Sequence, residues 1–251
     1  MKRKFIFAVL LVMACASIAF AQGADSKEAF LKANALYAEA KYAEAIAAYE
    51  KIIDSGIESG NIYYNLGNAY FKKNALGEAI LNYERARRLM PGDGDLESNY
   101  SHARSLIGRS VPEAPRKRFA RFIDGRFRYL TLNNMAILLS ALYISIVLIL
   151  IINIYTRVSR RQSAFIVVLL LLVLVAGAFS FRERVALISN EGILITNEAD
   201  ARFEPFDRAT THFTLYEGMK VRVIERKEGW YKIKRADGKI GWIRKAALNI
   251  I

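Results

Sequence analysis

Residues 66–80 have the sequence Leu-Gly-Asn-Ala-Tyr-Phe-Lys-Lys-Asn-Ala-Leu-Gly-Glu-Ala-Ile, and residues 32–46 have the sequence Lys-Ala-Asn-Ala-Leu-Tyr-Ala-Glu-Ala-Lys-Tyr-Ala-Glu-Ala-Ile. The two stretches lie 34 positions apart. A self-match at this period predicts repeated helix–turn–helix units, which bind other proteins and seldom carry out chemistry. We therefore expect an all-α repeat domain with one unit at 26–59 and a second at 60–93.

The second unit has the more complete pattern of large and small residues. Its pattern residues are Tyr63, Leu66, Gly67, Tyr70, Ala79, Tyr83, Ala86 and Pro91. This order resembles the tetratricopeptide repeat, in which small residues let two helices approach and large ones fill the space around the contact. The first unit keeps Ala33, Ala45 and Tyr49 but has Ile57 in place of the proline. The alternative is an unrelated helical hairpin.

A further helix is expected after the second unit. The turn Pro91-Gly92-Asp93-Gly94 ends one helix and offers aspartates to cap the next. Apolar residues then recur at helical spacing over 95–107. Two units alone leave an apolar face open, so we expect this helix to cap a repeat domain over 22–110.

The N-terminus resembles an export signal. A start of Met-Lys-Arg-Lys, an apolar run Phe5–Phe20 and small residues before Gln22 predict a signal peptide over 1–21. The alternative is a lipoprotein signal, with Cys15 as the lipidated residue. Cys15 is the chain's single cysteine, so its removal would exclude disulfides and thiol catalysis.

Two further apolar runs predict a transmembrane hairpin. Residues 134–155 and 164–181 approach the ~20 apolar residues that a helix needs to cross a bilayer. The loop 156–163 carries three arginines and is expected in the cytoplasm. The chain would thus sit in the bacterial inner membrane, with the domains on both flanks on the extracytoplasmic side. A pair of buried core helices is the alternative.

Much of the net charge of +13 lies beside these runs. The segment 111–133 is a basic linker in which aromatic residues lie near one helical face, so residues 116–128 are expected to bind anionic lipid. A solvated linker is the alternative. Export argues against a nucleic acid as the partner.

The sequence pattern of the C-terminal segment 182–251 predicts a small all-β barrel. Val185–Ser189, Gly192–Thr196, Val221–Glu225 and Trp230–Lys234 are the expected strands, separated by glycine-containing turns. The pieces Gly229-Trp230-Tyr231, Asp237-Gly238 and Gly241-Trp242 resemble bacterial SH3 domains, whereas the early Asn-Val-Arg segment of that family is degraded to Asp200-Ala201-Arg202-Phe203. We expect Trp230 and Trp242 in the core, and Phe203, Phe206 and Tyr216 on an exposed face.

Residues for catalysis, for a metal or for a cofactor are not found in the sequence. His102 and His212 are far apart, and neither has a cysteine or carboxylate at metal-ligand spacing. We expect a protein that is not an enzyme.

The layout of signal peptide, tetratricopeptide repeats, paired spans and SH3-like domain resembles the BatE-type proteins of the Bacteroides aerotolerance (Bat) cluster. This resemblance implies a membrane complex with von Willebrand A-domain partners and a MoxR-type ATPase, in stress tolerance or envelope assembly. We expect an envelope scaffold, with a cell-wall sensor that binds peptidoglycan as the alternative. The residues expected to line its partner-binding face are Phe30, Asn34, Tyr37, Asn61, Tyr64, Asn68, Phe71 and Lys72. Asn34 and Asn68 occupy the same repeat position, where an amide can hydrogen-bond a peptide backbone.

Overall fold

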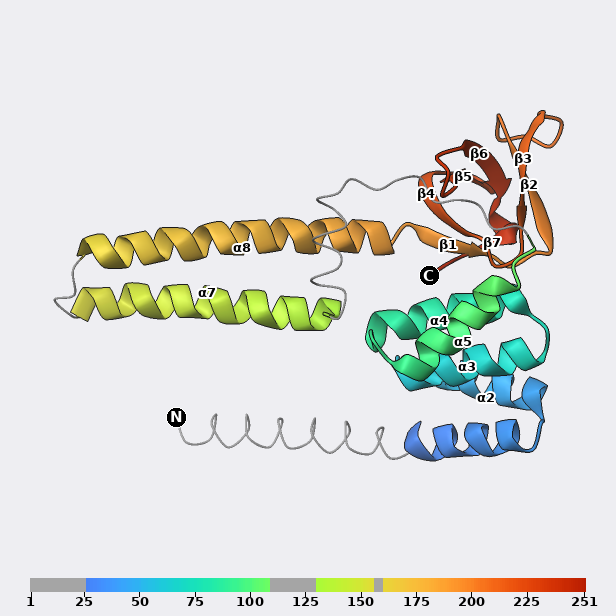
Figure 1. The fold of residues 1–251 in the computed structure, drawn as a ribbon, viewed down its shortest axis with the longest axis horizontal. Helices are drawn as coiled ribbons and strands as arrows, with labels where there is room; N and C mark the ends of the chain where they lie inside the picture. Colours follow the sequence, from blue (N-terminus) through green and yellow to red (C-terminus); the bar gives the residue numbers. More distant parts are fainter. Residues whose placement is uncertain (1–25, 109–129, 156–159) are drawn as a thin grey trace, which may run out of the picture.

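The computed structural model describes residues 26–108, 130–155 and 160–251. These form a helical repeat domain, a pair of long helices and a seven-stranded sheet (Figure 1). The predicted signal peptide 1–21 with Cys15, the segment 116–128 predicted to bind lipid and residues 156–159 of the predicted loop lie outside the described residues.

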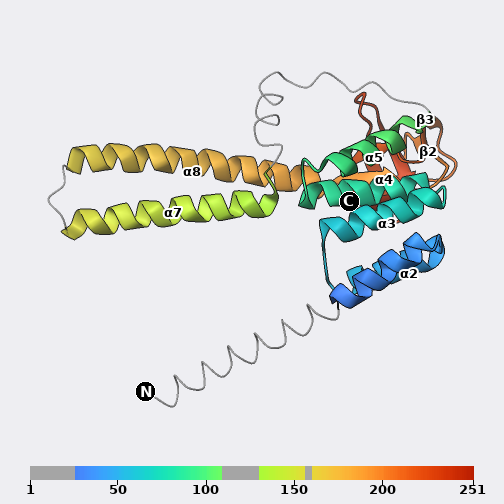
Figure 2. The same cartoon turned by 60° about the horizontal axis from the view of Figure 1, so that its bottom comes forward.

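The repeat domain contains the expected helices. A helix over residues 26–38 and α2 (Tyr42–Asp54) form the first unit, and α3 (Gly60–Lys72) with α4 (Leu76–Leu89) form the second. The turns between paired helices place Ala40 and Asn74, 34 residues apart, at the same positive φ of 59°. The helices lie side by side in chain order (Figure 2).

The fifth helix, α5 (Gly94–Ser105), continues the repeat. Its buried residues Leu96, Tyr100 and Ala103 lie 34 positions after Ile62, Leu66 and Ala69, which are buried in α3. The side chain of Asp93 caps the helix by accepting a hydrogen bond from the backbone N–H of Leu96 at 2.9 Å. The predicted capping helix is thus in the position of the first helix of a third unit.

The long helices α7 (Leu132–Tyr155) and α8 (Arg160–Ile188) pack against each other as a hairpin (Figure 1). Each is long and apolar enough to cross a membrane, and only 6% of each apolar window is buried. Their close approach uses Gly177, where a Cβ atom would lie 2.6 Å from Cδ2 of Leu139.

Two boundary predictions around α8 are wrong. Residues 160–163, predicted in the loop, belong to the first turn of α8, and Val185–Ile188, predicted as a strand with Ser189, form its last turn. The segment after Phe181 contains no glycine or proline, so nothing interrupts the helical hydrogen bonds, and the N–H of Ser189 still bonds the carbonyl of Val185 at 2.9 Å. Val185 is β-branched and favoured the strand prediction, but one such residue does not end the helix.

The sheet is antiparallel throughout, with the strand order β3-β2-β6-β5-β4-β1-β7. Its strands are β1 (Glu191–Leu194), β2 (Glu198–Arg202), β3 (Thr211–Tyr216), β4 (Lys220–Lys227), β5 (Trp230–Lys234), β6 (Ile240–Arg244) and β7 (Leu248–Ile250), with a short helix η1 (Lys245–Ala247) before β7. Trp230 and Trp242 are buried, as predicted. Phe203 and Phe206 are exposed, whereas Tyr216 is half-buried against the barrel core.

Gly67 controls the contact between α3 and α4. A Cβ atom at this position would lie 2.7 Å from Cδ1 of Tyr83, a ring that is only 1% exposed and therefore cannot swing away. We predict that Gly67→Ala lowers the unfolding free energy of the full chain by about 1–3 kcal/mol, because overpacking outweighs the usual gain from replacing a helical glycine. Urea unfolding in detergent measures this change.

Gly94→Ala is the matched control, because no atom lies within 4 Å of a Cβ atom there. It should change stability by no more than about 0.5 kcal/mol or increase it. Equal effects of the two substitutions would contradict the close contact at Gly67.

Candidate functional site

A row of asparagines joins the first helices of consecutive repeat units. The Oδ1 atom of Asn34 accepts hydrogen bonds from the Tyr49 hydroxyl at 2.6 Å and from Nδ2 of Asn65 at 2.9 Å. The same network recurs 34 residues later, where Oδ1 of Asn68 accepts from the Tyr83 hydroxyl at 2.7 Å and from Nδ2 of Asn99 at 3.0 Å. The row therefore runs from the helix over 26–38 through α3 to α5.

The tyrosines keep their protons in this network. Burial raises the pKa of Tyr49 to about 12 and raises the pKa of Tyr83 as well. Both hydroxyls therefore donate to the asparagine oxygens at physiological pH. Alanine at Asn34 or Asn68 would leave these hydroxyls without their acceptors, so these two asparagines also hold the repeat units together.

The remaining hydrogen-bonding groups of the asparagine row are the nitrogens of Asn34 and Asn68. Neither Nδ2 atom has an acceptor within the described part of the chain. Sequence reasoning foresaw the two amides but not their shared bonds to Asn65 and Asn99. The repeat period was the available signal, because both added asparagines are themselves 34 residues apart.

The aromatic candidates pack against neighbouring helices. The ring centroids of Phe30 and Tyr49 lie 6.1 Å apart, and those of Phe71 and His102 lie 5.6 Å apart. The other two predicted aromatics are likewise half-buried, Tyr37 beside Tyr42 and Tyr64 beside Tyr83. Of the predicted residues, Asn61 and Lys72 are exposed at opposite ends of α3.

A second surface of the repeat domain, formed by one face of α4, packs on the barrel. The N–H of Gly77 donates to Oε1 of Glu217 at 2.7 Å, and a Cβ atom at Gly77 would lie 2.7 Å from the Leu194 carbonyl. Ile80 follows one turn later and packs against Gly218. The spacing of Gly77, Ile80, Glu84 and Arg88 places all four on one helical face.

A buried charge sits at the centre of this contact. The carboxylate of Glu84 lies 3.2 Å from Nζ of Lys220 and 3.5 Å from Arg87, and accepts a 2.5 Å hydrogen bond from the Tyr100 hydroxyl. Burial alone would raise the pKa of Glu84, but Lys220, Tyr100 and Arg87 together lower it below its ordinary value. Lys220 also pairs with Glu191 at 2.8 Å, so one ammonium joins α4 to β4 and β1.

Arg88 fixes the end of α8 to the same helix. Its Nη2 atom donates to the Ile188 carbonyl at 3.0 Å, and its Nη1 atom donates to the backbone oxygen of Ile251 at 2.7 Å. Desolvation lowers the pKa of Arg88, and the pairing with Glu191 partly offsets this effect. One arginine thus joins the repeat domain, the apolar hairpin and the barrel.

The barrel also completes the apolar core of the repeat domain. Ile193 of β1 is fully buried in the cluster that contains Leu96, Tyr100 and Ala103 of α5. A complete third repeat would cover this face of α4 and α5 with a second helix. The barrel occupies that place and closes the stack.

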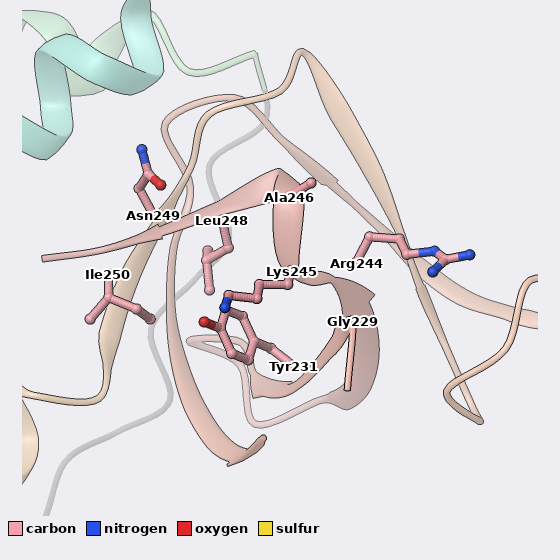
Figure 3. Close-up of a pocket in the computed structure, with 8 residues that line it drawn as sticks. All are labelled: Gly229, Tyr231, Arg244, Lys245, Ala246, Leu248, Asn249 and Ile250. Carbon is pink, nitrogen blue, oxygen red and sulfur yellow. The ribbon is translucent and has the colours of Figure 1, made fainter. Parts of the chain in front are cut away.

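The barrel has a shallow pocket of about 620 Å³ between β5, β6, η1 and β7 (Figure 3). Tyr231 and Lys245 are its polar groups, Leu248 and Ile250 are apolar, and Arg244 and Asn249 point away in this view. None of its eight lining residues is a carboxylate or a histidine. The pocket therefore lacks the paired acid and base that hydrolysis of a substrate ordinarily uses.

The described residues also contain no group of three or more potential metal ligands among His, Cys, Asp and Glu. The buried groups Glu84 and Tyr100 are bonded to each other at the contact between the domains.

Comparisons with known proteins match two parts of the chain. The tetratricopeptide repeat family matches residues 60–93, and the bacterial SH3 domain family matches residues 204–249. The predicted fold class is thereby confirmed: a helical repeat domain, two apolar helices as a hairpin and an SH3-like barrel. Strands β1 and β2 precede the matched span, in agreement with the degraded family pattern near Asp200–Phe203.

No curated protein matches the chain. Among solved structures it is similar to the "Structure of NlpC2 from Trichomonas vaginalis", with 23% sequence identity and a TM-score of 0.23. The alignment covers 25% of this chain and 24% of that one, so the chain spans about a quarter of the length of that protein.

Glu84 makes the docking of the two domains sensitive to acid. Its folded-state pKa is lowered, so its stabilising effect is complete above the ordinary glutamate pKa of 4.5 and is lost as the pH falls through the folded-state value. We predict that Glu84→Gln destabilises the chain most above about pH 5 and that the difference from wild type narrows toward about pH 3.5. Urea unfolding at each pH measures the difference.

Glu225→Gln is the matched control, because it removes a carboxylate from the exposed pair with Lys232. If the difference in unfolding free energy between Glu84→Gln and wild type stays constant across this pH range, the Glu84 carboxylate is not ionised in the folded chain.

Proposed function

We propose that this chain is a non-enzymatic membrane scaffold, whose repeat domain binds an extended segment of a partner protein along its first helices. The observation that carries this proposal is the asparagine row of Asn34, Asn65, Asn68 and Asn99. Tetratricopeptide repeats support a role in protein binding, and the row supplies polar groups at the repeat spacing.

The chemistry of the row matches a peptide backbone. An extended peptide presents N–H and C=O groups in alternation. The nitrogens of Asn34 and Asn68 supply donors for two such carbonyls, one in each repeat unit. The half-buried Phe30, Tyr37 and Phe71 supply apolar surface beside the row for side chains of the peptide. Exposed Asn61 and Lys72 extend the surface to both ends of α3.

The membrane arrangement is supported by the contact between the two domains. The repeat domain precedes the hairpin of α7 and α8, and the barrel follows it, yet α4 and β1 pack directly together. If both helices cross the bilayer, the two domains lie on the same side, where this contact can form. We place them on the extracytoplasmic side of the inner membrane, since the predicted signal peptide exports the N-terminal domain.

A role in envelope assembly or stress tolerance follows from the Bat-type layout. Within such a complex, von Willebrand A-domain proteins are the partners that the repeat groove would hold. Purification of the full chain from native membranes tests whether it belongs to such a complex. Von Willebrand A-domain proteins should be recovered with wild type and lost from a variant with substitutions at Asn34 and Asn68.

Peptidoglycan binding by the barrel is the second candidate function. Phe203 is 58% exposed and stacks on the His212 ring with centroids 4.4 Å apart, and Phe206 nearby is 49% exposed. Such rings suit the faces of sugars or envelope peptides. Retention of the full chain in detergent on purified sacculi, and its loss in Phe203→Ser, would favour this candidate.

The double substitution Asn34→Asp with Asn68→Asp tests whether a peptide binds along the asparagine row. Aspartate keeps an oxygen acceptor for Tyr49, Tyr83 and the neighbouring asparagines, but replaces each free nitrogen donor. A peptide selected by phage display on the full chain should bind the double variant up to roughly tenfold more weakly for each lost hydrogen bond. Fluorescence anisotropy measures the affinity.

The control variant is Asn249→Asp, which adds the same charge at an exposed position of β7. Its peptide affinity should equal that of wild type. Urea unfolding of each variant shows whether the double variant is still folded at the temperature of the binding measurement. Peptide binding that survives in the double variant would place the peptide elsewhere.

Reporter fusions test the membrane arrangement. A reporter that is active only outside the cytoplasm should be active after residue 110 and after residue 251, and inactive at Ser159, because the arginines of that loop stay in the cytoplasm. Comparison with a cytoplasm-active reporter at the same sites controls for expression. Export-dependent activity at Ser159 alone would reverse the orientation.

A further inference from the structure

Trp230 and Trp242 are buried, but they lie outside the core cluster on the inner face of the barrel. That cluster contains Tyr231, Ile233 and Ile243, which are their neighbours along β5 and β6. Successive side chains of a strand point to opposite faces of the sheet. The two tryptophans therefore lie on the outer face, where other side chains shield them from water.

Strand pairing identifies the other residues of this outer face. Trp242 lies between Arg202 of β2 and Lys232 of β5. Trp230 is likewise flanked by cations on β4 and β6, and the next pair along β4 and β5 is also cationic. We call this surface the basic face, and its six cations are Arg202, Arg222, Lys227, Lys232, Lys234 and Arg244.

The cationic side chains cover the indole rings. The Nζ atoms of Lys227 and Lys232 lie 5.1 Å and 5.4 Å from the centroid of the Trp242 ring. The guanidinium of Arg244 lies 4.4 Å from the centroid of the Trp230 ring, and each tryptophan is only 5% exposed. These contacts hold the charges in fixed positions, which reduces the entropy that is lost when a ligand binds them.

Three of the six cations are available to a ligand. Arg222, Lys227 and Lys234 are exposed and have no carboxylate partner among the residues that the structure describes. The carboxylate of Asp200, on the outer face of β2, accepts hydrogen bonds from two threonine hydroxyls of β3. Glu228 in the turn after β4 offsets one charge, so the face keeps an excess of positive charge.

Carboxylates of the chain itself already bind this face. Nε of Arg244 donates to Oδ1 of Asp207 at 3.1 Å, and its Nη2 atom donates to Oδ2. Asp207 belongs to the loop between β2 and β3, and Arg202 bonds two carbonyls of the same loop. The side chain of Asp207 is 66% exposed, so a carboxylate from outside has access to the same guanidinium.

We propose that the basic face binds an acidic segment of a partner protein. An extended segment places alternate side chains about 7 Å apart, which is also the spacing of Lys232 and Lys234 along β5. Charge complementarity and the existing pairs with Asp207 and Glu225 favour carboxylates as the ligand groups. The surface goes beyond the proposed repeat groove, and it depends neither on the asparagine row nor on the membrane arrangement.

The chain carries its own fluorescent reporter of this face, because Trp230 and Trp242 are its only tryptophans. The test titrates the full chain in detergent with a glutamate oligomer, which has no tryptophan. Binding at the basic face should change the tryptophan emission, whereas binding at the segment 116–128 or at the asparagine row should not. Salt should raise the half-saturating concentration, because exposed ion pairs are screened.

Lys227→Gln with Lys234→Gln should raise the half-saturating concentration by roughly two- to fivefold for each ion pair lost. The control is Lys32→Gln with Lys51→Gln, which removes two exposed cations from the repeat domain. It should bind the oligomer like wild type.

Asp207→Asn should act in the opposite direction. It releases Arg244 from its partner within the chain, so the half-saturating concentration should fall by roughly two- to fivefold. The control is Glu44→Gln, which removes an exposed carboxylate from α2 and should have no effect.

Any of three results would overturn the proposal. The first is a tryptophan emission that does not change during the titration, and the second is an equal effect of the face variants and their controls. The third is tighter binding of a polyphosphate of equal charge, which would assign the face to a phosphate polymer. None of these results affects the test of the asparagine row, which uses a different peptide and different variants.

Discussion

The arrangement of this molecule depends on one buried carboxylate. Glu84 is 5% exposed and would be strongly destabilising if it were alone, because an ion that leaves water needs charged or hydrogen-bonding partners. Its partners come from three elements: Arg87 from α4 itself, Tyr100 from α5 and Lys220 from β4. Arg87 and Tyr100 belong to the repeat domain itself, whereas Lys220 reaches the carboxylate only when the barrel is docked. The third partner therefore favours one relative position of the two domains over looser ones.

The docking contact leaves the opposite side of the repeat domain open. The barrel packs on α4, whereas the asparagine row runs along the first helices of the repeat units. A peptide bound to the row would therefore not compete with the barrel. Arg88 of α4 also bonds the Ile188 carbonyl, so the helix that carries the barrel contact is joined to the end of α8.

The repeat period allowed much of the helical fold to be predicted. Gly67 faces Tyr83 as its small size indicated, and the tryptophans of the barrel are buried. The same period could have predicted the hydrogen bonds of the asparagine row, because Tyr49 and Tyr83 each lie 15 residues after the asparagine to which they donate. The end of α8 was missed because a β-branched residue within an uninterrupted helix has little effect on its boundary.

The docking could not be predicted in the same way. A glutamate on a helix face is ordinarily solvated, and Lys220 lies 136 residues after Glu84. No local pattern links two positions at this distance. The surface of α4 that the barrel covers contains Gly77 and Ile80, which are not among the pattern residues of the repeat.

The order of synthesis gives this contact a further consequence. The repeat domain emerges first, and the face formed by Ile80, Leu96 and Glu84 has no cover until the barrel has been made. If α7 and α8 cross a bilayer as we propose and one of them fails to insert, the barrel ends on the other side of the bilayer and this face stays open. An exposed apolar patch with an unpaired acid is a feature by which chaperones and proteases distinguish incomplete chains from finished ones. Under the proposed membrane arrangement, the interface thus reports whether both helices of the hairpin have been inserted.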